Sequence, residues 1–600
     1  MTKNKKYSCD FETSTWNMDE TYVWAWAICD LENLETHYGN NIDSFMEYIF
    51  NLDNPKLFFH NLKFDGSFLL NWLFRNNFEW VADKKERKDN SFLTLITDKG
   101  QWYKITIYLK IGKKPKYIEI YDSLKKLPFS VKSIAESFKL PILKGEIDYE
   151  EYRSEEHIMS DEERSYIKND VEIVARALDI LEAQGMSKMT TSANALNNYK
   201  QILGNKNFER YFPKLPPLVD EYIRKTYKGG FTYVNDRFKN KNIGKGIVLD
   251  VNSLYPSRMK FERLPIGKPI YFKGKYQTNE NYPLYVQQIS CIFELKDNYI
   301  PTIQIKNNRW RFSENEYLKS SYGERVVLTL TNVDLELFFE HYEVYELKFM
   351  DGFMFRSCKG MFSQYIDYWT EQKIKAKKEG NGGLYTLSKL MLNSLYGKFG
   401  TNPKSALKIP YLSDEGILKF KLSEVTERDS IYIPIASFIT AYARNYTIRS
   451  AQKVYDRFMY ADTDSLHLRG FEIPKGLKVD DYELGAWKHE SSFDRAFYIR
   501  QKCYIENEIK TIKDVKKNKE KYEEHRKKRK MFHVKHLNRN YKIKGIRQIK
   551  VTVSGLPEQL RKYVNFENFR EGLVIDGKLT QKQVKGGALL SRTTFEIKKV

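Results

Sequence analysis

The sequence predicts a multidomain protein of mixed α/β and α+β class, and three observations support this fold class. The chain has 600 residues, and at roughly 150 residues per domain this length corresponds to about four domains. Hydrophobic residues make up 41% of the chain, so large packed cores can form and a largely disordered chain is excluded. Strand-like and helix-like patterns alternate early in the chain, and strand-rich stretches follow later.

An α/β unit is expected over the first 190 residues, followed by a larger α+β part. Strand-like runs (YSCDF, KLFFHNL, QWYKITIYL and KYIEIYDSL) precede an amphipathic helix at about Glu162–Glu182, where apolar side chains recur at helical spacing. A connector follows at about Thr190–Pro217. Beyond it the sequence predicts a strand-rich stretch over about Pro265–Cys358, a helical stretch over about Met361–Phe399 and a hairpin around Tyr460.

The charge of the chain is unevenly distributed. Its formal net charge of +22 points to a polyanionic partner, either nucleic acid or a membrane surface. Residues 1–190 contain 26 basic and 32 acidic side chains, a net charge of −6, so the remaining residues carry +28. The densest basic stretch, Lys510–Lys544, has 15 basic and 4 acidic side chains. It predicts either a solvated surface or a phosphate-contacting element, with equal weight.

Sequence signals for export and membrane insertion are absent. The N-terminal segment has no secretory pattern, and no stretch reaches about 18 consecutive apolar residues. A membrane partner is therefore disfavoured, and no membrane insertion is expected. The cysteines are odd in number and never in CxxC spacing, which argues against a disulfide framework or a zinc site and favours a reducing cytoplasm. These residues are Cys9, Cys29, Cys291, Cys358 and Cys503.

Acidic side chains in the first unit have a spacing suited to metal binding. Asp10 and Glu12 lie two residues apart in CDFET, so both would project from one face of a strand. Asp65 follows a strand-like run. Asp170 lies four residues after Tyr166 on the amphipathic helix, which places hydroxyl and carboxylate on one helix face. Each carboxylate alone is typical of a solvated surface, but together they predict a two-metal site for phosphodiester hydrolysis.

A second set of candidates lies beyond residue 190. Asp250 follows the apolar run GIVL, and Asp462 and Asp464 lie two residues apart in YADTDS. Between them, KLMLNSLYG would place a cation, an amide and an aromatic ring on one helical stripe: Lys389, Asn393 and Tyr396. This stripe suits a nucleoside triphosphate. Core packing would account for the Leu and Met residues of the segment but not for these three side chains.

These segments occur in the order found in family B DNA polymerases, which the chain resembles. DVNSLYP, KLMLNSLYG and YADTDS resemble motifs A, B and C of that family, and CDFET, HNLKFDG and YIKND resemble the motifs of its proofreading exonuclease. YKGG is similar to the linker motif between the two activities, and KCY to the KxY motif beyond motif C. Closer matches, such as YDSLKKLPF and NDRFK, indicate the protein-primed polymerases of small Salasmaviridae-type (Picovirinae-like) bacteriophages over essentially the whole chain.

The resemblance implies an RNase H-like 3′-to-5′ exonuclease domain joined to a right-hand polymerase of palm, fingers and thumb, with two insertions in the terminal-protein region. The implied domains, in order, are the exonuclease, 1–190; linker and palm with motif A, 191–260; first insertion, 261–359; fingers with motif B and palm, 360–401; second insertion, 402–424; palm with motif C and the basic segment, 425–544; and thumb, 545–600.

The resemblance also implies roles for individual residues. In the polymerase site, Asp250, Asp464 and the Val251 carbonyl would bind metal, with Asp462 in support. The incoming dNTP would contact Tyr255, Lys389, Asn393, Tyr396 and Val251. In the exonuclease site, the metal ligands would be Asp10, Glu12, Asp65 and Asp170, assisted by Tyr166 and Lys144. DNA would contact Thr13, His60, Asn61, Phe64, Ser123, Leu124, Phe129, Tyr227, Gly229, Gly230, Lys502 and Tyr504.

Two positions depart from the family pattern. A second phosphate-binding lysine is expected before motif B, but this segment is longer than in the family and offers four candidates: Lys373, Lys375, Lys377 and Lys378. Phe58 stands where a tyrosine that contacts terminal protein is expected.

By this resemblance, the chain is a DNA-directed DNA polymerase with a proofreading exonuclease that replicates a linear phage genome, primed by a terminal protein and with strand displacement. The implied cofactor is Mg²⁺, two ions per active site, which Mn²⁺ can replace. The implied partners are primer-template and single-stranded DNA, dNTPs and the terminal protein, with which a monomeric enzyme would form a heterodimer in the host bacterial cytoplasm. The alternatives are a conventionally primed family B polymerase, a nuclease with an inactive polymerase half, and a non-enzymatic DNA-binding protein.

Overall fold

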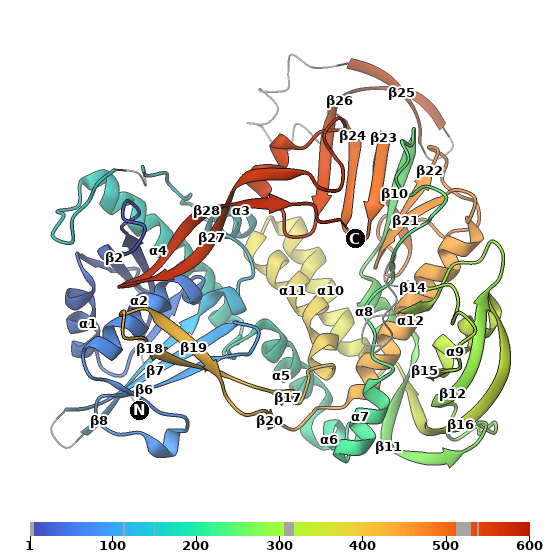
Figure 1. The fold of residues 1–600 in the computed structure, drawn as a ribbon, viewed down its shortest axis with the longest axis horizontal. Coiled ribbons are helices and arrows are strands. Elements are labelled where there is room, and N and C mark those ends of the chain that lie inside the picture. Colours follow the sequence, from blue (N-terminus) through green and yellow to red (C-terminus); the bar gives the residue numbers. More distant parts are fainter. Residues whose placement is uncertain are drawn as a thin grey trace.

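The computed structural model describes residues 5–111, 114–148, 151–304, 317–511, 530–536 and 539–599. In this part of the chain, two eight-stranded sheets and one four-stranded sheet form the framework (Figure 1). Helices and four two-stranded ribbons complete it. The same ranges contain no helix that is both long enough and apolar enough to cross a membrane.

The first eight-stranded sheet has the strand order β3-β2-β1-β4-β8-β7-β6-β5. Strand β1 pairs in parallel with β4 and antiparallel with β2, so it lies inside the sheet with both of its edges paired. The strands are β1 (Lys6–Thr13), β2 (Val23–Asp30), β3 (Thr36–Gly39), β4 (Lys56–Phe59), β5 (Glu79–Trp80), β6 (Ser91–Ile96), β7 (Trp102–Ile111) and β8 (Lys114–Asp122).

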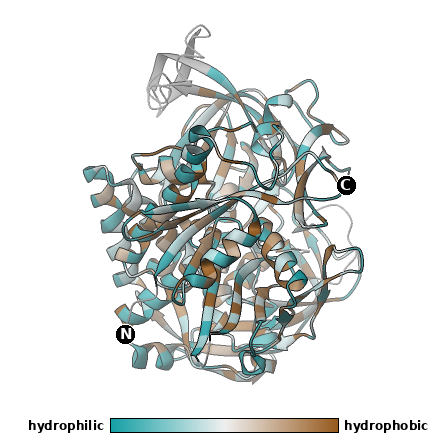
Figure 2. Cartoon of the chain, turned by 90° about the vertical axis from the view of Figure 1, so that its left-hand side faces the viewer, coloured by the Kyte–Doolittle hydropathy of each residue, from teal (hydrophilic) through white to brown (hydrophobic). Residues whose placement is uncertain are grey.

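Four helices complete the first domain: α1 (Ile42–Asn51), α2 (Leu62–Arg75), α3 (Val131–Phe138) and α4 (Asp161–Ala183). Helix α4 begins with a capping box, in which the side chains of Ser160 and Glu163 each accept a backbone N–H of the other residue. It packs against β1 and β2 with a face that includes Tyr166 and Asp170. Figure 2 shows hydrophobic and hydrophilic stretches alternating along these elements, as expected when one face of each is buried.

The second eight-stranded sheet collects strands from distant parts of the chain, in the order β25-β26-β24-β23-β10-β22-β21-β9. Strand β10 pairs antiparallel with both β22 and β23, which lie far downstream in the sequence. Most of the basic stretch Lys510–Lys544 lies outside the described residues. The strands are β9 (Thr232–Val234), β10 (Gly246–Val251), β21 (Phe458–Asp462), β22 (Ser465–Arg469), β23 (Trp487–Arg500), β24 (Cys503–Thr511), β25 (Lys530–His536) and β26 (Arg539–Val553).

Helices pack on one face of the second sheet and connect it to the first domain. Helix α12 (Ile433–Lys453) buries Ala443 and Ile448 against Leu249 of β10 and Leu466 of β22. Helices α10 (Ser363–Glu379) and α11 (Gly382–Phe399) pack against each other, and the turn between them contains Gly380, whose φ of 73° suits a glycine. The other helices outside the first domain and the insertion sheet are α5 (Thr191–Leu203), α6 (Asn205–Tyr211), α7 (Pro217–Arg224) and α8 (Leu254–Phe261).

A separate four-stranded sheet, which we call the insertion sheet, has the order β11-β16-β12-β15. It lies within the range that the sequence assigns to the first insertion. Its elements are β11 (Arg263–Lys273), β12 (Leu284–Leu295), β15 (Val326–Thr331), α9 (Asn332–His341) and β16 (Tyr342–Lys359). The ribbons are β13 (Ile303–Gln304) with β14 (Tyr317–Leu318), β17 (Lys404–Ser405) with β20 (Thr426–Glu427), β18 (Lys408–Leu412) with β19 (Leu418–Leu422), and β27 (Val574–Val584) with β28 (Gly587–Glu596).

The C-terminal ribbon β27–β28 crosses to the first domain (Figure 1). Gln581 Nε2 donates to the carbonyl of Lys63 at 3.0 Å. The N–H of Thr21 donates to the carbonyl of Lys585 at 2.9 Å. The first domain and the C-terminal ribbon are therefore in direct contact.

Candidate active sites

The first sheet carries a pair of carboxylates on the inner strand β1. Asp10 and Glu12 project to the same face because side chains alternate along a strand. Phe11 points to the opposite face, where its ring packs against Phe45 and Phe59 at centroid distances of 4.8 and 4.9 Å. The apolar side of β1 thereby fixes the face that the two carboxylates occupy.

Asp65 and Asp170 reach the same region from helices α2 and α4. A cavity of about 200 Å³ opens here. The charge of Asp170 acts on Asp10, and that of Asp10 acts on Asp65. The C-terminal strand β28 supplies part of the cavity wall, which the sequence does not predict. The lining residues are Asp10, Phe11, Glu12, Thr13, Ser14, Thr15, Phe64, Lys144, Tyr166, Asp170, Leu589 and Leu590.

Burial and mutual repulsion oppose the ionisation of these carboxylates. Burial, followed by the charge of Asp170, raises the pKa of Asp10 to about 7. Burial and the charge of Asp10 also raise the pKa values of Glu12 and Asp65. The Oδ1 atom of Asp170 is buried without a hydrogen-bond partner among the described residues. A divalent cation would relieve the repulsion and meet this acceptor, so the donor set fits a metal site.

Lys144 supplies positive charge beside Asp170. Its ammonium group pairs with the Asp170 carboxylate and lies 5.3 Å from the ring centroid of Tyr166. Tyr166 and Asp170 share one face of α4, as their spacing of four residues requires. Within the described ranges, no three carboxylate, imidazole or thiol side chains are gathered closely enough to hold an ion as they stand. Metal binding at this cluster would therefore involve a shift of side chains.

The residues expected to grip a single DNA strand fall into two groups. Thr13 and Phe64 line the cavity together with the carboxylates. His60 is bound within the protein, because its Nδ1 contacts Ser123 Oγ at 2.9 Å and its Nε2 contacts the Phe129 carbonyl at 2.7 Å. His60 therefore ties these two residues to the start of α2. The second group consists of His60, Asn61, Ser123, Leu124 and Phe129.

The second carboxylate site forms where strands of the second sheet meet. Strand β10 ends in Asp250 and Val251, and Asp250 lies opposite Ser465 in the pairing with β22. The N–H of Val251 donates to the carbonyl of Asp464 at 2.8 Å. Thr463, in the turn between β21 and β22, has a φ of 62°. This turn, which we call the catalytic turn (residues 462–464), brings Asp464 next to Asp250.

Asp462 is held by polar neighbours. Thr232 Oγ1 donates to its Oδ1 at 3.1 Å, Tyr460 OH donates to its Oδ2 at 3.4 Å, and Lys502 Nζ lies 3.6 Å from its Oδ1. The N–H of Lys502 donates in turn to Tyr460 OH at 3.1 Å. The ring of Tyr504 packs on that of Tyr460 with a centroid distance of 5.0 Å. The KCY segment therefore contacts motif C directly.

Like charges also crowd the second site. Burial and the charge of Asp250 raise the pKa of Asp464 to about 6. Burial raises the pKa of Asp250 as well, although Lys488 Nζ lies 3.1 Å from its Oδ1. Glu490 adds to the repulsion on both aspartates. This donor set also fits a divalent cation. The sequence does not predict Lys488 or Glu490, because β23 carries no motif at these positions.

The stripe on α11 is accessible next to this site. Lys389 and Asn393 are exposed, and Tyr396 is half-buried. The ring of Tyr396 stacks on that of Tyr255 from α8, with a centroid distance of 4.1 Å and an interplanar angle of 24°. The two rings therefore form a flat wall beside a cation and an amide.

Of the four lysines that the sequence leaves open, Lys373 is the one that is partly buried near Lys389 and Lys488. Burial and the charges of Lys389 and Lys488 lower the pKa of Lys373. Lys389 and Lys488 also act on Asp250. The three other candidates are exposed on α10: Lys375, Lys377 and Lys378. Lys373 is therefore a second cation close to Lys389, which itself acts on Asp250.

The YKGG segment packs against the catalytic turn. A Cβ atom at Gly230 would lie 2.6 Å from Thr463 Oγ1. The N–H of Thr463 donates to the carbonyl of Phe231 at 2.7 Å. The side chain of Tyr227 lies against Gly400, where an added Cβ would meet the tyrosine hydroxyl oxygen at 2.6 Å. The lack of a side chain at position 230 allows the linker to approach motif C this closely.

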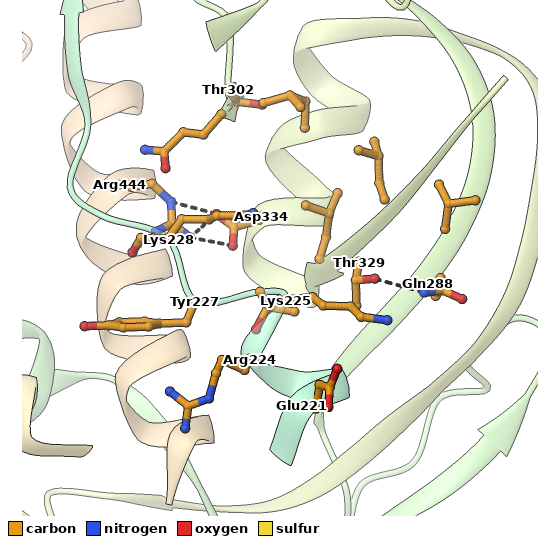
Figure 3. A pocket seen from close by; sticks show the side chains of 16 residues that line it. Glu221, Arg224, Lys225, Tyr227, Lys228, Gln288, Thr302, Thr329, Asp334 and Arg444 are labelled. Carbon is orange, nitrogen blue, oxygen red and sulfur yellow. Dashed lines mark hydrogen bonds and ion pairs between the residues drawn. The ribbon is translucent and has the colours of Figure 1, made fainter. Parts of the chain in front are cut away.

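A larger cavity of about 520 Å³ lies between this linker, the insertion sheet and α12 (Figure 3). Arg444 of α12 forms an ion pair with Asp334 of α9 along its wall. None of the predicted catalytic carboxylates lines this cavity, so it is separate from both sites. Its charged lining residues are Glu221, Arg224, Lys225, Lys228, Asp334 and Arg444.

A family comparison agrees with this arrangement. Residues 46–482 match the family described as DNA polymerase type B, organellar and viral. The chain belongs to this family of DNA polymerases. Similar proteins include the DNA polymerase of Bacillus phage Nf, 47% identical over 598 residues, which cover 99% of this chain and 100% of the relative. The DNA polymerase of Bacillus phage phi29 is 46% identical over 598 residues, 99% of each chain.

Solved structures show the same similarity. Phi29 DNA polymerase complexed with primer-template DNA has a TM-score of 0.90 and 44% identity, covering 99% of this chain and 100% of that one. Its complex with primer-template DNA and incoming nucleotide substrates has a TM-score of 0.90 and 45% identity, with the same coverage. The resemblance to family B polymerases and the multidomain fold class, with an exonuclease and a polymerase domain, are confirmed. The residue roles and domain boundaries stay predictions.

Proposed function

We propose that this DNA polymerase extends DNA at the second carboxylate site and removes nucleotides from 3′ ends at the first. The observation that carries the proposal is the pair of separate carboxylate clusters, each with raised pKa values and a lysine beside an aspartate. Two such clusters suit two metal-dependent reactions on one polymer. Related phi29 structures are complexes with primer-template DNA, single-stranded DNA and incoming nucleotides, which supports the proposed substrates.

In the polymerase site, Asp250, Asp464 and the carbonyl of Val251 would hold two Mg²⁺ ions, which Mn²⁺ can replace. When bound, these ions favour deprotonation of the primer hydroxyl and neutralise charge on the triphosphate. Asp462 supports the site through its contacts with Thr232 and the KCY segment.

The surrounding side chains would bind the nucleotide. Lys389 and Lys373 attract its phosphates as two positive charges on neighbouring helices. The stacked rings of Tyr255 and Tyr396 provide a flat apolar surface for sugar and base. Asn393 offers a hydrogen-bonding amide on the same stripe.

In the exonuclease site, the cavity would hold the 3′ end of a frayed strand. Tyr166 orients the attacking water, and Lys144 stabilises negative charge that develops on the phosphate. Thr13 and Phe64 line one side of the cavity for the terminal nucleotides, and the leucines of β28 line it as well. The metal ligands would be Asp10, Glu12, Asp65 and Asp170, two ions being held as in the polymerase site.

Two substitutions test the assignment of two sites. Asp464→Asn should abolish Mg²⁺-dependent dNTP incorporation while 3′-to-5′ degradation continues, and Asp10→Ala should do the reverse. Both activities are measured on one labelled primer-template, with and without dNTPs. Loss of both activities in either folded variant would contradict the two-site proposal. A wild-type chain that binds DNA but incorporates no dNTP would be a DNA-binding protein without activity.

We further propose that the enzyme is a monomer that starts synthesis on a terminal protein in the host bacterial cytoplasm and displaces the non-template strand. The support is the similarity over nearly the whole chain to Bacillus phage polymerases, which includes both insertions. Incubation with dATP, Mg²⁺ and the phage's own terminal protein should give a covalent nucleotide adduct. An active polymerase that forms no adduct would instead use conventional primers. Extension through a downstream duplex tests strand displacement.

A further inference from the structure

The first domain contains a buried arginine outside the cavity. Arg153 is 3% exposed, and its guanidinium lies 4.8 Å from the ring centroid of Trp24. Its Nε atom pairs with Glu163 in the first turn of α4. Its Nη1 atom donates to the carbonyls of Asp148 and Glu151 at 2.8 and 3.1 Å. Each of these contacts compensates for burying the charge, and together they tie a loop to a helix.

That loop begins at a predicted catalytic residue. Lys144 lies four residues before Asp148, and its ammonium group pairs with a carboxylate on α4. A Cβ atom at Gly145 would lie 3.2 Å from the ring of Tyr166. Helix α4 places three side chains on one face, at spacings of three and four residues: Glu163, Tyr166 and Asp170. Lys144, the earlier residue of the loop, therefore contacts Asp170, the later residue of the helix face. Arg153, the later residue of the loop, contacts Glu163, the earlier one.

Glu163 is itself fixed on both oxygens. His157 Nε2 lies 2.8 Å from Oε2, and the N–H of Ser160 donates to the same oxygen at 2.9 Å. Burial raises the pKa of Glu163, but the hydrogen bonds from Arg153 and His157 lower it by more, so the carboxylate is ionised. The far end of the loop is thus attached to a rigid, charged point on α4.

We propose that Arg153 is a positioning residue for the exonuclease reaction: it anchors the far end of the loop and so holds the Lys144 ammonium group beside Asp170. The inference rests on the proposed exonuclease function. Arg153 does not line the cavity, so it acts through Lys144 and not on the DNA strand. A displacement of about 1 Å in a catalytic group can lower a rate on the order of 10²-fold.

The test measures exonuclease kcat and KM on a single-stranded oligonucleotide with Mg²⁺, and dNTP incorporation in parallel, all with the full-length chain. Arg153→Ala should lower kcat on the order of 10²-fold while KM and incorporation stay within about twofold. Arg153→Lys should not restore the rate, because one ammonium group cannot replace the planar fork. Arg164→Ala is the control, an arginine on α4 next to Glu163: its side chain is 50% exposed, so the rate of this variant should match the wild type.

A double variant separates positioning from a general structural role. If Arg153 acts through Lys144, then adding Arg153→Ala to Lys144→Ala should cause no further loss of kcat. Additive losses, or a wild-type rate in Arg153→Ala, would overturn the inference. If Arg153→Ala also lost incorporation, the loss would be structural, and Arg153→Lys would be used in its place. The kcat of Arg153→Lys would then be compared with and without Lys144→Ala. Absence of 3′-to-5′ degradation in the wild-type chain would refute the proposed function itself, before any variant is compared.

Discussion

Arg444 and Asp334 form a bidentate ion pair that joins α12 to α9 of the insertion sheet. Arg444 Nη2 lies 2.9 and 2.8 Å from the two carboxylate oxygens, and the arginine side chain is 3% exposed. Its Nη1 atom donates to the carbonyls of Lys228 and Gly229, both at 3.0 Å. Because the following residue, Gly230, packs against the catalytic turn, the ion pair connects the insertion sheet to the polymerase site.

Asp334→Asn should destabilise the folded protein by about 3 kcal/mol, because it leaves a buried guanidinium without its counter-charge. Incorporation should fall more than degradation, since Arg444 contacts the linker beside the catalytic turn. Urea unfolding and the two activity assays measure these effects. Glu340→Gln, at the 41% exposed partner of Arg449, is the control and should cost less than about 1 kcal/mol. If both variants lost the same free energy of unfolding, the buried ion pair would contribute no more to stability than an exposed one.

Gly230→Ala should lower the polymerase kcat on the order of 10²-fold, because the new Cβ would push Thr463 and with it Asp464. The proposed 3′-to-5′ degradation should continue, since the cavity beside Asp10 is separate from this turn. Single-turnover incorporation on a primed template gives the rate. Gly244→Ala is the control, because its Cβ would meet no atom within 4 Å. A normal rate in Gly230→Ala would mean that the turn tolerates the displacement.

Lys373→Ala should raise the KM for dNTP about tenfold, because it removes one of the two lysines proposed to bind the triphosphate through charge-assisted contacts. Steady-state incorporation over a range of dNTP concentrations provides the KM. Lys378→Ala changes an exposed lysine of the same helix and should leave the KM within about twofold. If the KM rises for Lys378→Ala and not for Lys373→Ala, the assignment of the second phosphate-binding lysine is wrong.

In the absence of divalent ions, both carboxylate clusters should destabilise the fold as the pH rises. The pKa is about 7 for Asp10 and about 6 for Asp464, above the ordinary value of 3.8, so the folded state binds these protons more tightly than the unfolded state. Their stabilising contribution is complete below about pH 4 and is lost as the pH rises through about 6 to 7.

Mg²⁺ should therefore raise the Tm more at about pH 8 than at about pH 5, because protons compete with the ion for the same carboxylates. Thermal unfolding with EDTA or with Mg²⁺ measures the difference. Asp10→Asn should bring the Mg²⁺-dependent rises in Tm at the two pH values closer together, since it removes one of the carboxylates for which protons and Mg²⁺ compete. An Mg²⁺ effect of equal size at both pH values would contradict a role for these carboxylates in ion binding.

Short-range sequence patterns predicted which side chains share one face of a strand or helix, because the local backbone alone determines this. The two-residue spacing in CDFET placed Asp10 and Glu12 on one face because β1 is a regular strand. The helical stripe of KLMLNSLYG likewise places Lys389 and Asn393 on an accessible face, since α11 is continuous from residue 382 to 399.

Contacts between distant segments could not be predicted in the same way. Glu490 acts on Asp250 only because β23 pairs with β10, and no local pattern encodes that pairing. Lys373 and Lys377 share a helix face in the sequence, so only the packing of α10 beside α11 distinguishes them. The sequence also gives no sign that the ring nitrogens of His60 bond to residues that follow β8; its contact with DNA stays a prediction.

The contact between the first domain and the C-terminal ribbon has a consequence for folding. Asp10 belongs to β1 and Leu590 to β28, the first and the last strand that the structure describes. The cavity between them therefore gains its second wall only when the ribbon docks on the first domain, a contact between segments that are very distant in the sequence. A variant that lacks the ribbon would keep the carboxylates but lose this wall of the cavity.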